Sequence, residues 1–224
     1  MRTIILKPEA YMAKLTIYGT PASRTFRTLW MAKELGLEHE HVPVDFRKGD
    51  TKKEEYRRLN PNERIPTIQD GDLVLWESMA INLYLAKKHG GPLAPKNLAE
   101  EALATQWSMW GLTEAEPDIV NVLRNRFMLP EAQRDEASAK RSEDALKKPM
   151  AVLEGALAKR DWLVGDRCTV ADINLAGIVS TVHRIKLDLA PYPKVAAWLK
   201  RCLDRPAAVA ALKQREEAMK ALAA

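Results

Sequence analysis

Short apolar runs and helical patterns alternate along residues 15–84, and this alternation constrains the fold more than any other feature of the chain. An apolar run at 15–18 ends at Gly19, and apolar residues with helical spacing follow from 26 to 35. A second apolar run at 41–45 contains a proline, which favours a sheet edge or the end of a strand. The predicted order of this first half is strand, helix, strand.

A hairpin and a further helix are predicted in the second half of the stretch. Asp70 and Gly71 lie between two apolar runs, which is a strong signal for a β-hairpin. Ser78 precedes apolar residues with helical spacing and is predicted as the N-cap of a helix that ends at Gly90. We therefore expect residues 15–89 to form a compact α/β domain with four strands, in the order βαβ-ββα.

Helical patterns continue through the rest of the chain. Residues 90–97 are rich in glycine and proline and are predicted as a linker, and an all-α domain is predicted at 98–224. Within that domain, Pro117 is expected to separate the first two helices. Thr169 and Asp172 have the spacing of a capping box, which predicts the start of another helix.

Charge and apolar patterning exclude several classes of protein. The net charge of +5 is spread evenly, since residues 1–90 hold 15 Lys and Arg against 12 Asp and Glu and the remainder holds 20 against 18. Without a basic arm, we expect no nucleic-acid partner. Residues 1–14 have no sustained period and are predicted as an N-terminal extension without the apolar core of a secretory signal. No apolar run approaches the roughly 18 residues of a membrane span, so we expect a cytoplasmic protein with no membrane partner.

The two cysteines are predicted to be reduced and structural. Cys168 and Cys202 lie far apart, and neither belongs to a C-x-x-C motif or to a paired histidine spacing. The sequence therefore predicts no metal site, no redox dithiol and no disulfide framework. Because Cys168 directly precedes the predicted capping box, at the position of a hydrophobic staple, we interpret it as a packing residue rather than a reactive thiol.

Ser23 is the first candidate for chemistry, and two interpretations are open. A serine ahead of a helix can be an ordinary N-cap, which contributes about 1 kcal/mol. A hydroxyl at the positive end of a helix, just after a strand and a turn, is also well placed to stabilise an anion. Arg24 and Arg27 add positive charge nearby.

The second candidate cluster follows in the same stretch. Pro66 stands just before a short strand, which indicates either a constrained, cis bond that leaves the preceding backbone open to a ligand or an ordinary edge-strand proline. Glu77 and Ser78 together offer a carboxylate, a hydroxyl and a backbone N–H at a predicted helix start. Such a group is suited to an amino-acid head group, which carries both an amine and a carboxylate.

In this order and spacing, these motifs resemble the cytosolic glutathione transferases over residues 15–212, most strongly the serine-type classes phi and theta and their bacterial relatives. The resemblance implies a thioredoxin-like α/β domain followed by an all-helical domain. It also implies a homodimer in which the first domain of one chain meets the helical domain of the other. The segments that carry the resemblance are 18–24, 33–38, 60–68, 70–81 and 162–173.

The resemblance implies roles for individual residues. Ser23 would donate its hydroxyl hydrogen to the sulfur of glutathione, with Tyr18 as the alternative used by tyrosine-type relatives. The backbone of Ile65, before a cis Pro66, would pair with the cysteinyl unit. The γ-glutamyl end of the peptide would be held by Glu77 and Ser78.

The glycyl carboxylate of glutathione has more than one candidate partner. Arg64 stands where the family commonly has glutamine or lysine before the Val/Ile-Pro pair, and it is within reach of that carboxylate in this interpretation. Lys52 or Lys53 falls near another family position that holds the same group. The sequence does not decide between Lys52 and Lys53.

The electrophile is expected to bind against the helical domain. Trp107 and Trp110 lie on its first predicted helix, and Glu114 follows Trp110 at i+4, so these residues either line an apolar pocket or belong to the interdomain core. The expected function is conjugation of glutathione to a hydrophobic electrophile. Glutathione is the expected co-substrate, and no metal is expected to take part. Glutathione-dependent dehalogenation, isomerisation and peroxide reduction on the same site are alternatives, as is a non-catalytic interaction module.

Overall fold

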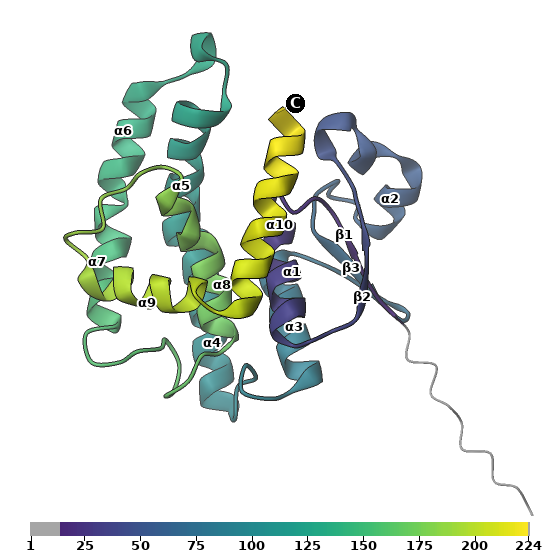
Figure 1. The fold of residues 1–224 in the computed structure, drawn as a ribbon, viewed down its shortest axis with the longest axis horizontal. Coiled ribbons are helices and arrows are strands. Elements are labelled where there is room, and N and C mark those ends of the chain that lie inside the picture. The colour runs from purple at the N-terminus through teal and green to yellow at the C-terminus, as the bar shows by residue number, and fades with distance from the viewer. Residues whose placement is uncertain (1–13, 224) are drawn as a thin grey trace, which may run out of the picture.

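One four-stranded sheet forms the centre of the N-terminal part (Figure 1). The structure is a computed structural model that describes residues 14–223, so the predicted extension lies outside the described residues except for Lys14. In the sheet order β2-β1-β3-β4, β1 pairs in parallel with β2 and antiparallel with β3, and β3 pairs antiparallel with β4. The strands are β1 (Leu15–Tyr18), β2 (His39–Val42), β3 (Thr67–Asp70) and β4 (Leu73–Trp76). The predicted α/β architecture and the Asp70-Gly71 hairpin are confirmed.

Three helices accompany the sheet: α1 (Thr25–Glu34), α2 (Glu54–Leu59) and α3 (Ser78–His89). The sequence predicts α1 and α3 but not α2. The six residues of α2 include only Tyr56 and Leu59 as apolar residues, so no helical period is visible in that charged segment. Tyr56 is nevertheless buried, and its hydroxyl donates to the carbonyl oxygen of Arg64 at 2.6 Å. The short helix therefore anchors the loop that leads to Pro66.

Two local predictions are corrected by the structure. β2 ends at Val42 instead of spanning 41–45, because Pro43 has no N–H with which to continue the ladder, although β2 does lie at the sheet edge as predicted. Ser78 is not the N-cap of α3. Glu77 occupies the cap position, no side chain caps the helix, and Ser78 is the first helical residue.

The helical part continues the fold through a long composite helix. The sequence predicts a break at Pro117, but the chain passes from α4 to α5 through a π-helical turn, Gly111–Ala115. Pro117 lies in the first turn of α5, where a proline interrupts the hydrogen bonding of a helix least. The helices are α4 (Leu98–Trp110), α5 (Glu116–Leu123), α6 (Glu136–Ala145), α7 (Lys147–Ala156), α8 (Val170–Val179), α9 (Pro193–Leu203) and α10 (Pro206–Ala223).

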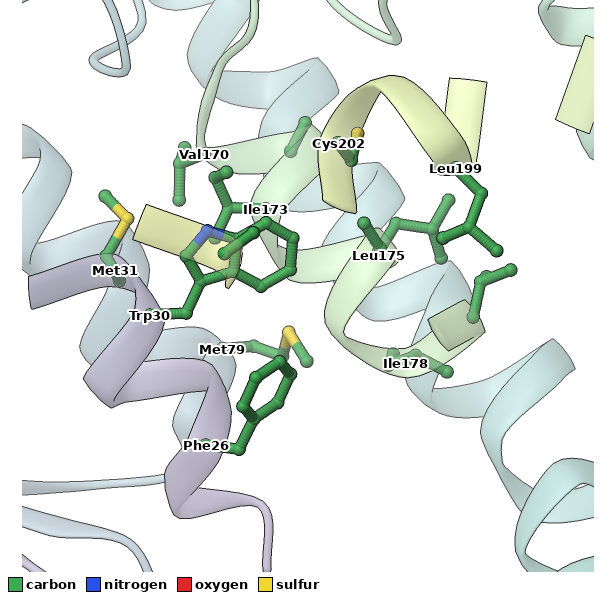
Figure 2. Close-up of a cluster of buried hydrophobic side chains, with 14 of the residues drawn as sticks. Phe26, Trp30, Met31, Met79, Val170, Ile173, Leu175, Ile178, Leu199 and Cys202 are labelled. Atoms are coloured by element: carbon green, nitrogen blue, oxygen red, sulfur yellow. The ribbon is translucent and has the colours of Figure 1, made fainter. Parts of the chain in front are cut away.

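The two parts of the chain meet on α1. This helix packs against α3 in the N-terminal part and against α8 and α10 in the helical part. Figure 2 shows Trp30 of α1 beside Ile173 of α8 and Phe26 of α1 beside Met79 of α3, and all four side chains are buried. Because apolar burial on both sides fixes α1, the beginning of this helix has a defined position relative to both parts.

The start of α8 is organised by the predicted capping box. The Thr169 side chain and the Asp172 carboxylate cap the helix reciprocally, as expected. Asp172 is fully buried, and its carboxylate also accepts from the backbone N–H of Leu163 and from Nε1 of Trp198, each at 2.9 Å. The neighbouring Cys168 is buried and unpaired, and burial raises the pKa of its thiol, which agrees with a structural role.

Replacing Asp172 by alanine is expected to destabilise the protein strongly. The change leaves the N–H groups of Thr169, Leu163 and Trp198 buried without an acceptor. An unsatisfied buried donor costs about 1–3 kcal/mol, so we expect a loss of at least about 3 kcal/mol in the free energy of unfolding measured with urea. Asp166→Ala, at an exposed position, serves as the control and should change this free energy by less than about 0.5 kcal/mol. Equal effects of the two substitutions would contradict the assignment.

Candidate active site

A cavity of about 460 Å³ lies at the beginning of α1, between the N-terminal part and the α4–α5 helix. Six of the residues selected from the sequence line it together, although they come from three separate segments of the chain. These residues are Ser23, Arg64, Ile65, Pro66, Glu77 and Ser78. The loop before α1, the loop before β3 and the beginning of α3 therefore meet around one space.

Ser23 lies in the turn that precedes α1, one residue before the N-cap position held by Arg24. Its hydroxyl donates to the carbonyl oxygen of Thr20 at 2.7 Å, and its oxygen accepts from the N–H of Thr25 at 3.1 Å. The second bond satisfies one of the free N–H groups at the start of the helix. Ser23 is therefore not the N-cap of α1, although its oxygen binds the N–H of the first helical residue while the side chain lines the cavity.

Gly19 makes the turn before α1 possible. Its backbone has a φ of +138°, and a Cβ at this position would lie 2.1 Å from Oγ1 of Thr25. A side chain at residue 19 would therefore displace Thr25, which is fully buried and lies 3.0 Å from the Ser23 oxygen through its own hydroxyl. The position of the Ser23 hydroxyl depends on the absence of a side chain at Gly19.

The loop around Pro66 is held by buried polar groups. Asn60 donates from Nδ2 to the carbonyl oxygen of Arg64 at 2.8 Å, alongside the bond from Tyr56. The Ile65–Pro66 peptide bond is cis, as the resemblance implied. Within residues 14–223, the N–H and carbonyl of Ile65 have no backbone hydrogen-bond partner. This peptide edge is therefore open to a bound peptide at the cavity.

Glu77 has an unusual backbone conformation at the start of α3. Its φ of +74° is uncommon for a residue with a side chain and is often found at ligand sites. The following Ser78 is buried, and its hydroxyl lies 3.5 Å from Nη1 of Arg27. Because the N-terminus of α3 carries unpaired N–H groups and partial positive charge, this corner of the cavity favours a carboxylate.

A buried carboxylate from the helical part completes the cavity wall. Glu116 is 5% exposed, and its Oε1 accepts from Nη2 of Arg27 at 2.6 Å and from Nε of Arg24 at 2.8 Å. Burial raises the pKa of Glu116, but the two guanidinium charges lower it by more, so the net pKa is below its ordinary value. Arg27 crosses α8 at Gly177, where a Cβ would lie 2.9 Å from Cγ of the arginine. The carboxylate is therefore ionised and held between the two parts of the chain.

Three predicted residues of the N-terminal part lie away from this lining. The hydroxyl of Tyr18 donates to Oε1 of Gln69 at 3.3 Å, on the sheet. Lys52 is exposed, and Lys53 forms an ion pair with Asp50 at 2.7 Å. None of the three predicted side chains belongs to the cavity wall.

The helical part contributes other residues than the sequence predicts. Trp107 and Trp110 pack edge to face, with ring centroids 5.2 Å apart, against the hydrophobic core, and Glu114 is exposed. Leu112 and Glu116 line the cavity instead. Trp107 and Trp110 precede the π-helical turn at 111–115, whereas Leu112 lies within it and Glu116 directly follows it.

Besides Leu112 and Glu116, three further lining residues were not singled out by sequence reasoning. Phe46 lies in a charged segment without a recognisable period, and its side chain is exposed at the cavity. Asn60 and Glu63 belong to the loop before Pro66, and Arg24 was noted only for its charge. Glu116 had no local signal at all, because its partners lie about ninety residues earlier in the chain.

Residues 14–223 contain neither a cluster of metal-ligating side chains nor a helix suited to crossing a membrane. No group of three or more His, Cys, Asp or Glu side chains is arranged to hold a metal ion there. No helix in the described part of the chain has both the length and the apolar composition needed to cross a membrane.

Comparisons with known proteins identify the family of this fold and site. Residues 13–87 match the model of the glutathione S-transferase N-terminal domain, and residues 117–206 match that of the C-terminal domain. A probable glutathione S-transferase GSTF2 of Oryza sativa subsp. japonica is 35% identical over an alignment of 204 residues, and the match covers 87% of this chain and 94% of the relative. The chain belongs to the glutathione S-transferase family.

Solved structures of the same family superpose on most of the chain. The theta class glutathione S-transferase of Xanthomonas axonopodis pv. citri, solved with glutathione bound, has a TM-score of 0.82 and 33% identity, and the match covers 88% of this chain and 96% of that one. The glutathione transferase URE2P5 of Phanerochaete chrysosporium has a TM-score of 0.88 and 26% identity, with 96% and 100% covered. The order of a thioredoxin-like α/β part and a helical part is therefore that of the family.

Replacing Glu116 by alanine is expected to destabilise the protein by about 3–5 kcal/mol, because Arg27 would remain buried without a counter-charge. The measurement is the free energy of unfolding in urea. Glu114→Ala is the matched control, since it removes an exposed carboxylate two residues earlier in the chain. The control should lose less than about 0.5 kcal/mol. If the two variants were equally stable, the ion pair would not hold the two parts together.

Proposed function

We propose that this protein is a glutathione S-transferase that binds glutathione in the cavity and transfers it to a hydrophobic electrophile. The observation that carries the proposal is the meeting of Ser23 with Ile65, Pro66, Glu77 and Ser78 around one cavity, in a chain of this family. The thiolate sulfur attacks an electrophilic carbon, a sulfur–carbon bond forms, and the leaving group departs with its bonding electrons. Leu112 and Phe46 supply an apolar side to the cavity that suits such a co-substrate.

Each end of the glutathione peptide has a proposed partner. The free backbone edge of Ile65 pairs with the cysteinyl unit. Glu77 receives the α-amine of the γ-glutamyl end, while the Ser78 hydroxyl and the N-terminus of α3 receive its carboxylate. The glycyl carboxylate pairs with Arg64, which lines the cavity. Lys52 and Lys53 remain predicted alternatives for this last contact.

The Ser23 hydroxyl is sufficient in magnitude to activate the thiol. A free thiol with a pKa of about 8.5 is only about 3% ionised at pH 7. Lowering this pKa by about two units takes about 2.7 kcal/mol. A hydrogen bond to a charged acceptor contributes about 1.5–3 kcal/mol, and a helix N-terminus about 0.3–1 kcal/mol. No general base is then needed.

Activation requires one local rearrangement. The Ser23 hydrogen turns from the carbonyl oxygen of Thr20 to the sulfur, while the N–H of Thr25 continues to hold the serine oxygen. The exchange replaces a hydrogen bond to a neutral acceptor by one to an anion, which is the stronger of the two.

We also propose a cellular location, a role and the absence of certain partners for this enzyme. We place it in the cytoplasm, with a role in detoxification, no metal, and no membrane or nucleic-acid partner. Dehalogenation, isomerisation and peroxide reduction use the same bound thiolate and differ only in the co-substrate. A non-catalytic module would retain the cavity without turning over any electrophile.

Ser23→Ala is expected to raise the pKa of the bound glutathione thiol by about 1–2 units, because it removes one hydrogen bond to the thiolate. The measurement is a pH titration of thiolate absorbance in the complex. Tyr18→Phe is the matched control and should leave the titration unchanged, since Tyr18 binds Gln69 on the sheet.

The same samples test the function as a whole. The parent protein and both variants should be retained on immobilised glutathione, and the parent should conjugate a generic aryl halide. A folded parent that is not retained would refute the proposed function. An unchanged thiol pKa in the Ser23 variant would refute only the role of the serine.

We further propose a homodimer, in which the N-terminal part of one chain meets the helical part of its partner. Large apolar side chains exposed on both parts support it, including Trp76 on β4 and Met109 on α4. Sedimentation at micromolar concentration should give twice the mass of one chain, and Met109→Glu should shift the protein toward the single-chain mass. Val152→Glu, at an equally exposed apolar position on α7, should have no such effect. A single-chain mass for the parent would contradict the proposal.

A further inference from the structure

Two hydroxyl groups lie next to each other at the beginning of α1, and only one of them lines the cavity. The oxygens of Ser23 and Thr25 are 3.0 Å apart. Ser23 lines the cavity, whereas Thr25 is fully buried and does not. Within residues 14–223, Ser23 is the only hydrogen-bond partner of the Thr25 hydroxyl. The Thr25 hydroxyl can therefore act on the cavity only through Ser23.

The direction of the hydrogen bond between the two hydroxyls follows from the number of hydrogens. Ser23 has one hydroxyl hydrogen, which lies within reach of the carbonyl oxygen of Thr20 at 2.7 Å and of the Thr25 hydroxyl at 3.0 Å. A carbonyl oxygen can only accept, so the contact at 2.7 Å requires the hydrogen of Ser23. Thr25 is then the donor between the two hydroxyls, because its own hydrogen would otherwise be buried without an acceptor.

The backbone of Gly19 leaves the space that the Thr25 hydroxyl occupies. A Cβ at residue 19 would lie 2.1 Å from Oγ1 of Thr25. Gly19 is itself held at β2, because its N–H donates to the carbonyl oxygen of Val42 at 3.0 Å and its carbonyl oxygen binds Nε2 of His41 at 2.8 Å. The contact between the two hydroxyls is therefore fixed by the turn before α1.

We propose that Thr25 is a positioning residue, which donates its hydroxyl hydrogen to the Ser23 oxygen while Ser23 donates to the sulfur of glutathione. The inference rests on the proposed function and adds a second hydroxyl to the activation of the thiol. The Ser23 oxygen then accepts from both the N–H and the hydroxyl of Thr25, which hold it when its hydrogen turns away from Thr20. An oxygen that accepts hydrogen bonds also becomes a stronger donor, because bonds in a chain polarise one another.

The test removes the Thr25 hydroxyl while it keeps the shape of the side chain. Thr25→Val should raise the pKa of the bound glutathione thiol by about 0.5 unit, since cooperative strengthening is on the order of 10–30% of a hydrogen bond. The measurement is a pH titration of thiolate absorbance in the complex. Thr25→Ser keeps the hydroxyl and should retain the parent value.

Thr28→Val is the matched control. Thr28 lies in the same helix, and its buried hydroxyl has no hydrogen-bond partner in the described structure. The substitution therefore removes a buried hydroxyl that is not linked to Ser23, and it should leave the pKa of the bound thiol unchanged.

The pH dependence of turnover separates this role from a structural one. At a pH below the thiol pKa of both proteins, Thr25→Val should lower kcat/KM about threefold, which is the loss of thiolate that a shift of about 0.5 unit causes. The loss should disappear at a pH above both pKa values, because the thiol is then ionised in either protein. A distorted turn would instead lower kcat/KM at every pH.

Failure of this inference and failure of the proposed function give different results. A folded parent protein that does not bind glutathione would overturn both. A parent that binds glutathione and lowers its thiol pKa, with the same pKa in Thr25→Val, would overturn only the role of Thr25. A shift in Thr25→Ser as large as that in Thr25→Val would do the same. Thr25→Ala also lacks the hydroxyl and replaces Thr25→Val if that variant does not fold.

Discussion

The buried ion pair between Arg27 and Glu116 joins the two parts of the chain at the place where the chemistry is proposed. Neither charged group is stable in the interior alone, so each holds the other in place. The ion pair thereby holds the beginning of α1 against the α4–α5 helix. The pair requires a flat surface on α8, which Gly177 provides. Ser23 and Ser78 lie at either end of this arrangement, one beside Arg24 and the other beside Arg27. The cavity in which we propose that the peptide binds thus depends on one contact between the two parts of the chain.

The charge distribution around that contact gives the cavity two different ends. Toward the sheet, the charged side chains of Arg64 and Glu77 lie with the free backbone groups of Ile65 in the cavity lining. This arrangement is suited to a peptide with one amine and two carboxylates. Toward the helical part, Leu112 adds an apolar side chain beside the ionised Glu116. A family fold can keep the first end constant while the second changes with the co-substrate, because the two ends are built from different parts of the chain.

Local sequence signals were sufficient wherever the interaction partners are close in the chain. The Asp70-Gly71 hairpin follows from turn chemistry, and the capping box at Thr169 follows from a three-residue spacing. Signals failed where tertiary context overrides local preference. α2 lacks a visible period, and Ser78 is a helical residue rather than a cap because Glu77 adopts a positive φ before it.

The sequence by itself determined the family and the order of an α/β part and a helical part. It also selected six residues that meet at the cavity, because these depend on short motifs within one domain. Only the tertiary structure decided the rest of the cavity lining. Leu112 in the π-helical turn and Glu116 just after it line the cavity, whereas Trp107 and Trp110 pack against the hydrophobic core. The pairing of Glu116 with α1 joins residues about ninety positions apart, and the approach of Arg215 to Phe26 joins residues near opposite ends of the described chain. Helical periodicity carries no information about such contacts, since they depend on how separate helices pack.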